Sequence, residues 1–147
     1  MEINGLPAHA LLVHVVVVVL PLAALAAVVV SVWPAAQRKL TFLVPLAAVV
    51  GLLAVPVTTA AGTALAANLG NPAFIARHRE LGLQVLPWAA ALAVTTTAQW
   101  LYLRGRRRGR DNAGLALAAL VIVSAVGTAV IVALTGDAGA RAVWGNR

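Results

Sequence analysis

Four long apolar stretches alternate with short polar segments along the chain. The stretches cover about residues 11–32, 40–62, 83–103 and 113–134, and none of them contains Asp, Glu, Lys or Arg. Each approaches or reaches the ~20 residues that a helix needs to cross a hydrocarbon core of about 30 Å. The pattern predicts an all-α, polytopic membrane protein, with four transmembrane helices in an up-down bundle that forms a single domain over residues 1–147.

Composition supports this prediction. Hydrophobic residues make up 62% of the chain and charged residues 10%, whereas soluble domains carry about 25% charged residues. The segment before the first apolar stretch contains Glu2 but no Lys or Arg, so it does not resemble a cleaved signal peptide, and we expect the first helix to be retained. The predicted location is the bacterial cytoplasmic (inner) membrane, as a multi-pass protein surrounded by lipid.

The distribution of cations predicts how the helices are oriented. Seven of the eleven Lys and Arg residues lie in the connections between the first and second and between the third and fourth stretches. By the positive-inside rule these connections are cytoplasmic, so both termini face the outer side. We therefore interpret the net charge of +7 as a feature that orients the helices in the membrane, and we expect no nucleic-acid partner. The cations of these two connections are Arg38, Lys39, Arg104, Arg106, Arg107, Arg108 and Arg110.

The sequence contains few signs of catalytic or transport chemistry. Ion-coupled transporters usually carry charged groups inside the membrane, but the four stretches contain no Asp, Glu, Lys or Arg. No nucleophile–base pair, phosphate-binding glycine loop or metal-binding helix pattern is present, and the absence of cysteine excludes thiolate metal sites. We therefore expect no catalytic residues and no metal-ion site. Gly51 and Gly127 are expected to be points where helices approach closely.

All three histidines fall on the predicted outer side. His9 and His14 are five residues apart, so they diverge by about 140° around a helix and cannot form a metal pair on one face. His14 and His78 come from different helices, and a haem can be held axially by two such histidines in a bundle. The simpler alternative is that these histidines are hydrated residues at the membrane interface.

Charged residues near the histidines extend this predicted outer-side cluster. Arg77 and Arg79 flank His78, and either guanidinium can pair with a haem propionate. Asp137, just after the fourth stretch, is expected on the same side, together with His9. These four residues complete a cofactor-binding cluster around His14 and His78.

Three short segments resemble a known family. They are GLPAHALLVH at 5–14, RHRELG at 77–82 and TGDAGARAVW at 135–144, and they resemble predicted four-helix membrane proteins of unknown function that are common in actinobacteria. In that family the opening usually resembles H-P-x-x-V-H and the last segment often resembles G-H-S-G-A. This chain has Ala10 in place of the proline of the opening, and Asp137 in place of the histidine of the last segment. The resemblance implies the fold and the membrane location, and its histidine pattern is similar to that of b-type cytochromes. Asp137 removes one histidine from that pattern.

These observations leave three functional hypotheses. The first is a non-catalytic accessory subunit that binds other membrane protein subunits in a larger assembly, such as a respiratory complex. The alternative is a b-type haem protein that transfers electrons through the outer-side histidines, with haem b as its cofactor. A third is a quinone or lipid site near His14, Thr58 and Trp88.

Overall fold

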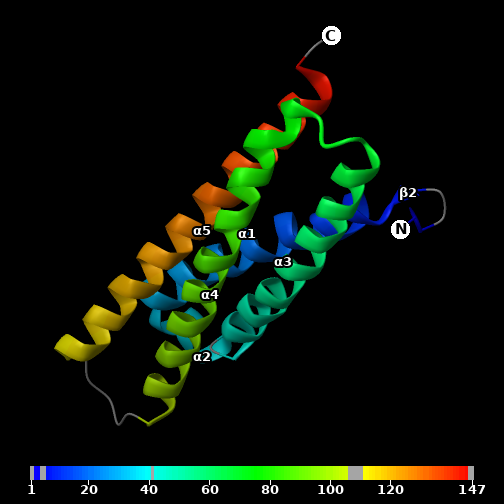
Figure 1. The fold of residues 1–147 in the computed structure, drawn as a ribbon. Coiled ribbons are helices and arrows are strands. Elements are labelled where there is room, and N and C mark those ends of the chain that lie inside the picture. The colour runs from blue at the N-terminus through cyan, green and yellow to red at the C-terminus, as the bar shows by residue number, and fades with distance from the viewer. Residues whose placement is uncertain (1, 4–5, 41, 106–110, 146–147) are drawn as a thin grey trace.

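The computed structural model confirms an all-α bundle, with four helices long and apolar enough to cross a membrane. It describes all residues except 1, 4–5, 41, 106–110 and 146–147. The long helices are α1 (Ala8–Val32), α3 (Leu43–Asn68), α4 (Ala76–Gly105) and α5 (Asn112–Trp144), and they run alternately up and down the bundle (Figure 1).

Short elements occupy the ends of the long helices. Two two-residue strands, β1 (Glu2–Ile3) and β2 (Leu6–Pro7), pair antiparallel just before α1, with Glu2 opposite Pro7 and Ile3 opposite Leu6. The helix α2 (Pro34–Leu40) follows α1, and the 3₁₀ turn η1 (Ala73–Ile75) precedes α4. Gly70 has φ 75°, a left-handed conformation that commonly follows a helix end, and it begins the turn after α3.

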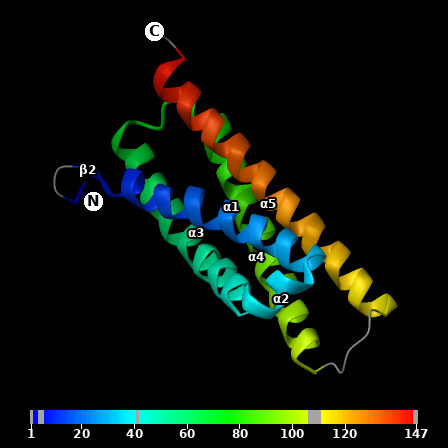
Figure 2. The same cartoon turned by 180° about the vertical axis from the view of Figure 1, so that it is seen from behind.

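The helices pack in the order α1, α3, α4, α5 around the bundle. Each packs against its two neighbours in this order, while the diagonal helices α1 and α4 have little contact with each other (Figures 1 and 2). The bundle therefore consists of two antiparallel hairpins, α1 with α3 and α4 with α5. We call the end at which α1 and α4 begin the histidine end, and the end with α2 and the start of α5 the glutamine end.

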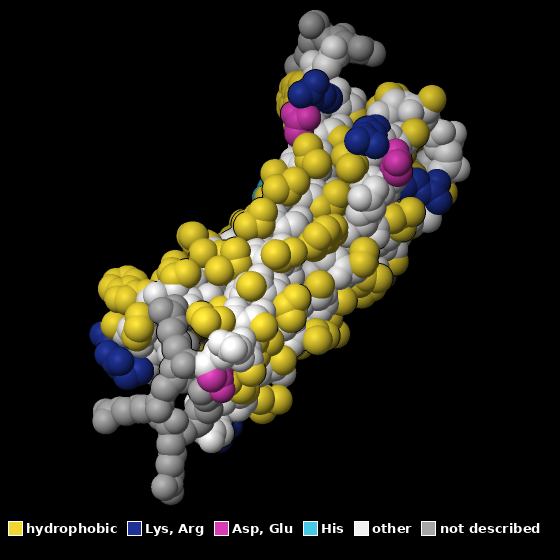
Figure 3. Space-filling view, turned by 90° about the vertical axis from the view of Figure 1, so that its left-hand side faces the viewer, with side chains coloured by type: hydrophobic (Ala, Val, Ile, Leu, Met, Phe, Trp, Pro, Cys, Tyr) yellow, Lys and Arg dark blue, Asp and Glu magenta, His cyan; other side chains and the backbone are white. Residues whose placement is uncertain are grey.

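The core is built largely from small and β-branched side chains. One buried cluster near the glutamine end is rich in alanine and includes Ala27, Ala48 and Ala93, and a second nearer the histidine end includes Leu20, Val85 and Ile131. Small residues allow helices to approach closely in lipid, where there is no hydrophobic drive between helices. Figure 3 shows the matching exterior, with apolar side chains along its length and charged side chains at the two ends.

Gly51 and Gly127 are points of close approach, as predicted. A Cβ at Gly51 would stand 2.9 Å from Leu20 Cγ of α1. A Cβ at Gly127 would overlap the indole ring of Trp88 of α4. Each glycine thus lets one helix of a hairpin accept a large side chain from the other.

Several helix boundaries differ from the predicted stretches; α3, for example, ends at Asn68 instead of at about residue 62. The third stretch was predicted to begin at about residue 83, but α4 begins at Ala76, so residues 76–82 form its first turns. The fourth helix was expected to end at residues 135–137, but α5 continues to Trp144. At about 1.5 Å per residue its 33 residues span roughly 50 Å, so α5 exceeds a hydrocarbon core of about 30 Å.

The arginine-rich connection lies mostly outside the described residues. Of its cations, only Arg104 is described, at the end of α4, where its guanidinium carbon lies 4.9 Å from the centroid of the Trp100 ring. Asp111 begins the next helix, with its carboxylate accepting a hydrogen bond from the Gly114 backbone N–H at 2.8 Å. This is an N-cap, which satisfies one of the free donors at a helix start.

Candidate functional site

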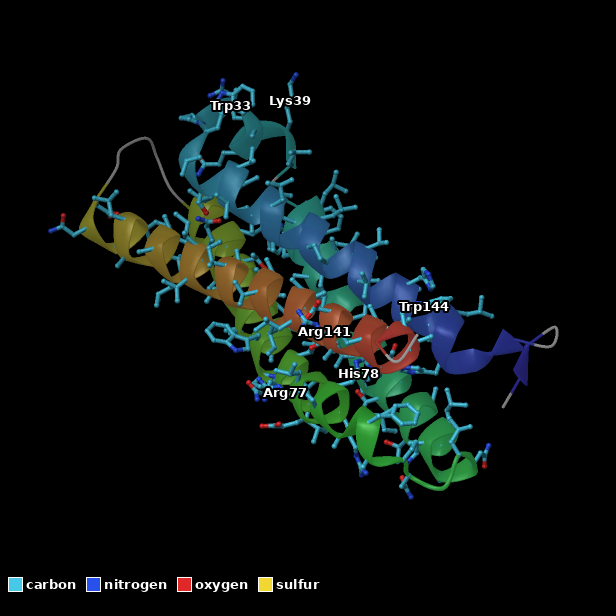
Figure 4. All side chains as sticks on the ribbon, turned by 90° about the horizontal axis from the view of Figure 1, so that it is seen from above. Trp33, Lys39, Arg77, His78, Arg141 and Trp144 are labelled. Atoms are coloured by element: carbon cyan, nitrogen blue, oxygen red, sulfur yellow. The ribbon has the colours of Figure 1, made fainter. Side chains whose placement is uncertain are left out.

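Two imidazoles from diagonally opposite helices meet at the histidine end. His9 lies in the first turn of α1 and His78 in the first turn of α4. Their ring centroids are 6.3 Å apart and their planes meet at 78°. Figure 4 shows His78 with Arg77, Arg141 and Trp144, at the opposite end from Trp33 and Lys39.

Each imidazole is held by a backbone carbonyl of the other helix in its hairpin. His9 Nδ1 lies 3.0 Å from the Thr58 carbonyl oxygen of α3, and His78 Nδ1 lies 2.9 Å from the Thr135 carbonyl oxygen of α5. Because a carbonyl oxygen only accepts, Nδ1 must carry the hydrogen and donate it. In the neutral ring, Nε2 then holds the lone pair, which is the form that binds a metal.

A glycine beside each histidine makes room for the ring. Gly62 follows Thr58 by four residues, and a Cβ there would stand 2.9 Å from His9 Cε1. Gly139 follows Thr135 by four residues, and a Cβ there would stand 3.0 Å from His78 Nδ1. Both rings therefore lie directly against the backbone of the neighbouring helix.

The ring that contacts His78 is His9, whereas the sequence hypothesis paired His78 with His14 as haem ligands. His14 has an exposed side chain further along α1. His9 and His14 cannot both point into the bundle because they diverge by about 140° around the helix. The structure thus brings together His9 and His78.

The charged residues of the predicted cluster lie at the same end but on its surface. Arg77 Nη1 is 3.1 Å from Glu80 Oε2, and Arg141 Nε is 2.8 Å from Asp137 Oδ2, with all four side chains more than half exposed. Arg79 is also exposed. Exposed ion pairs of this kind contribute only about 0–1 kcal/mol, so these arginines are free to exchange partners when an anion approaches.

Three residues of the site were not assigned to it from the sequence: Gly62, Gly139 and Thr135, while Thr58 was named there only for a quinone or lipid site. The signal that could have revealed them is a repeated spacing. T-x-x-x-G occurs at 58–62 and again at 135–139, in each case late in the second helix of a hairpin.

The two imidazoles suit a cofactor that itself supplies most of the ligands of its metal ion. Among the described residues, no cluster of three or more His, Cys, Asp or Glu could hold a metal ion. A protein zinc site usually takes at least three protein ligands, which two imidazoles do not supply. A haem, whose macrocycle provides four nitrogens, needs only axial ligands from the protein.

Comparison with known proteins identifies the family. No curated protein and no solved structure matches the chain. Residues 5–147 match a family described as "Predicted membrane protein (DUF2231)". Since this match covers almost the whole chain and its description agrees with the four apolar helices, the protein belongs to the DUF2231 family of membrane proteins.

Proposed function

We propose that the protein is a b-type haem-binding, electron-transferring membrane subunit in which His9 and His78 would hold the haem. The observation that carries this proposal is the paired geometry of the two rings, each with Nδ1 on a backbone carbonyl. Histidines that ligate metals almost always donate their other ring N–H to a carbonyl or carboxylate, which fixes the tautomer and the ring orientation. Both imidazoles already have this support.

The separation of the rings also supports the proposal. A haem held by both histidines would take one nitrogen from each ring, so the two rings have to lie close together. The centroids of His9 and His78 are 6.3 Å apart. Cofactor sites in helical bundles are commonly built from side chains of facing helices, and α1 and α4 face each other across the bundle.

The surrounding charge suits an anionic cofactor. Arg77, Arg79 and Arg141 lie at the histidine end, and a guanidinium binds a carboxylate through strong, charge-assisted hydrogen bonds. The propionates of a haem are such carboxylates. When bound, the haem supplies one-electron redox chemistry, and the protein supplies the ligands, the charge and the apolar surroundings.

A single site at one end also supports the accessory role. The three histidines of the chain all lie towards one end of the bundle. A site at one end would not reach across a core of about 30 Å, so an electron donor and an electron acceptor would both have to reach the histidine end. We therefore propose that other membrane subunits, as in a respiratory complex of the bacterial inner membrane, supply one of them.

An absorption spectrum tests the proposal. The protein is expressed with ample haem, purified in mild detergent and measured oxidised and reduced. We expect a Soret band and a sharp α band from the wild type, and loss of both in His9→Ala and in His78→Ala. His14→Ala is the matched control, because its side chain is exposed, and it should keep the wild-type spectrum.

Two results would contradict the proposal. A colourless wild type after expression with haem would exclude a haem protein. Loss of the spectrum in His14→Ala, with His9→Ala unchanged, would instead support the pairing of His14 with His78 that the sequence suggested.

A further inference from the structure

The two hairpins contain the same arrangement of three residues. In each, a histidine lies in the first turn of the first helix, and its Nδ1 donates to a threonine carbonyl of the second helix. In each, a glycine four residues after that threonine lies against the imidazole. The residues are His9, Thr58 and Gly62 in one hairpin and His78, Thr135 and Gly139 in the other.

The two hairpins also resemble each other deeper in the bundle, where each has a second glycine contact. Gly51, eleven residues before Gly62, packs against Leu20 of α1. Gly127, twelve residues before Gly139, packs against Trp88 of α4. The hairpins thus share two matched glycine contacts, while the side chain that fills the deeper one differs in size.

We infer that the site consists of two equivalent half-sites, one in each hairpin, and that Gly62 and Gly139 are its positioning residues. By leaving out a side chain, each glycine lets an imidazole lie close enough to the neighbouring helix for Nδ1 to reach the carbonyl. This fixes Nε2 as the ligating nitrogen of both rings. The identity of the ligand rests on the proposed function, but the half-sites themselves do not.

Replacing Gly62 or Gly139 with alanine should push the neighbouring imidazole away from the helix. At Gly62 the new Cβ would stand 2.9 Å from His9 Cε1 and 3.0 Å from Nδ1, so the ring must move away. At Gly139 the distances are 3.0 Å to His78 Nδ1 and 3.1 Å to Cε1, so a smaller shift is enough. Normal N–H···O bonds measure about 2.7–3.2 Å, and a shift of a few tenths of an ångström takes either bond beyond this range.

The first experiment needs no haem. The protein is labelled with ¹⁵N-histidine and reconstituted in lipid nanodiscs, where the nitrogen chemical shifts report which ring nitrogen carries the hydrogen. In the wild type we expect His9 and His78 both to be protonated on Nδ1. Gly62→Ala should change the His9 signals alone, and Gly139→Ala the His78 signals alone and by less.

Gly136→Ala is the matched control. Gly136 follows Thr135 directly, and a Cβ there would meet nothing within 4 Å, so the histidine signals should stay as in the wild type. Circular dichroism and size-exclusion chromatography check that each variant folds. Unchanged histidine signals in both Gly62→Ala and Gly139→Ala would overturn the inference, as would an equal change in Gly136→Ala.

The second experiment measures haem binding. Loss of an outer-shell partner of a ligating histidine typically lowers metal affinity by roughly 10–100-fold. We expect haem affinity to fall by this factor in Gly62→Ala and Gly139→Ala, the former more strongly, and to stay within about twofold in Gly136→Ala. A wild type that binds no haem would refute the proposed function, while the nitrogen spectra would still test whether the half-sites exist. Unchanged haem affinity in both glycine variants would refute only the positioning role of the glycines.

Discussion

The two ends of the bundle both use polar side chains between helices, but they use them differently. At the glutamine end, Gln99 Nε2 donates to Ser31 Oγ at 3.0 Å, and Ser31 Oγ in turn donates to the Ala27 carbonyl at 2.8 Å. Gln99 and Ser31 are only 6% and 8% exposed. At the histidine end, each half-buried imidazole bonds through Nδ1 and keeps a second nitrogen with a lone pair.

The difference between the two ends distinguishes polar groups that only hold helices together from polar groups that can also bind a ligand. Among the described residues, no buried side-chain nitrogen or oxygen lacks a hydrogen-bond partner, so the amide and hydroxyl groups at the glutamine end are used within the bundle. They hold α1 to α4 but have no ionisable group to offer a ligand. What distinguishes the histidine end is that the bonds to the carbonyls use only Nδ1 of each imidazole, so the lone pair of Nε2 is not used by these bonds.

The largest expected effect concerns the orientation of the two ends. The chain has no cysteine, so Ala73→Cys and Ala113→Cys each introduce a single thiol at an exposed alanine, one at each end. By the positive-inside rule, a membrane-impermeant maleimide added to intact cells should label Ala73→Cys fully and Ala113→Cys only after permeabilisation. The reverse pattern would place the histidine end in the cytoplasm.

The next largest effect is expected at the packing point between the two ends. Gly127→Ala would place a methyl group where the Trp88 ring lies, and overpacking of this kind costs typically 1–3 kcal/mol. Unfolding in mixed micelles should show this loss relative to Gly136→Ala, whose new Cβ meets nothing. Equal stability of the two variants would mean that the α4–α5 interface adapts without cost.

A smaller effect is expected at the glutamine end. Gln99→Leu removes the bond to Ser31, while Ser31 keeps its bond to the Ala27 carbonyl. Interhelical hydrogen bonds in membranes contribute about 0.6 kcal/mol on average and up to about 1.7 kcal/mol, so the loss of stability should lie in this range. The histidine nitrogen signals should not change; a change would show that the two ends are coupled.

The smallest effect is expected from the surface charges. Arg141→Ala breaks an exposed pair with Asp137, and such i, i+4 pairs contribute roughly 0.3–0.5 kcal/mol. The stability of the ligand-free protein should therefore hardly change. Haem affinity should fall slightly if Arg141 pairs with a propionate, and Glu80→Gln, which releases Arg77 from its pair, should act in the opposite direction.

The sequence predicts the fold well because length and apolar content suffice for membrane helices. The four apolar stretches and the close approaches at Gly51 and Gly127 were predicted, and the structure confirms them. Helix ends were harder to predict, because Thr135-Gly136-Asp137 has the composition of a helix end. In the structure α5 continues through it, and Asp137 pairs with Arg141 one turn later.

The partner of His78 could not be predicted for a different reason. Apart from His14 and Ser31, residues 11–32 are apolar on every side of the helix, so the pattern does not indicate which face of α1 points into the bundle. The spacing of His9 and His14 shows that only one can face inward, but not which. The contacts with Thr58 and Gly62 decide this, and they are backbone features that side-chain chemistry does not reveal.

The diagonal placement of the two histidines has a consequence for thermal stability. α1 and α4 share few contacts of their own, so a group bound by both imidazoles would act as a cross-link between helices that are otherwise joined mainly through their neighbours. Such a ligand stabilises the folded state according to its free concentration, by about 2.7 kcal/mol at one hundred times its Kd. Loading the site should thus raise the melting temperature, and in either single-histidine variant the rise should disappear.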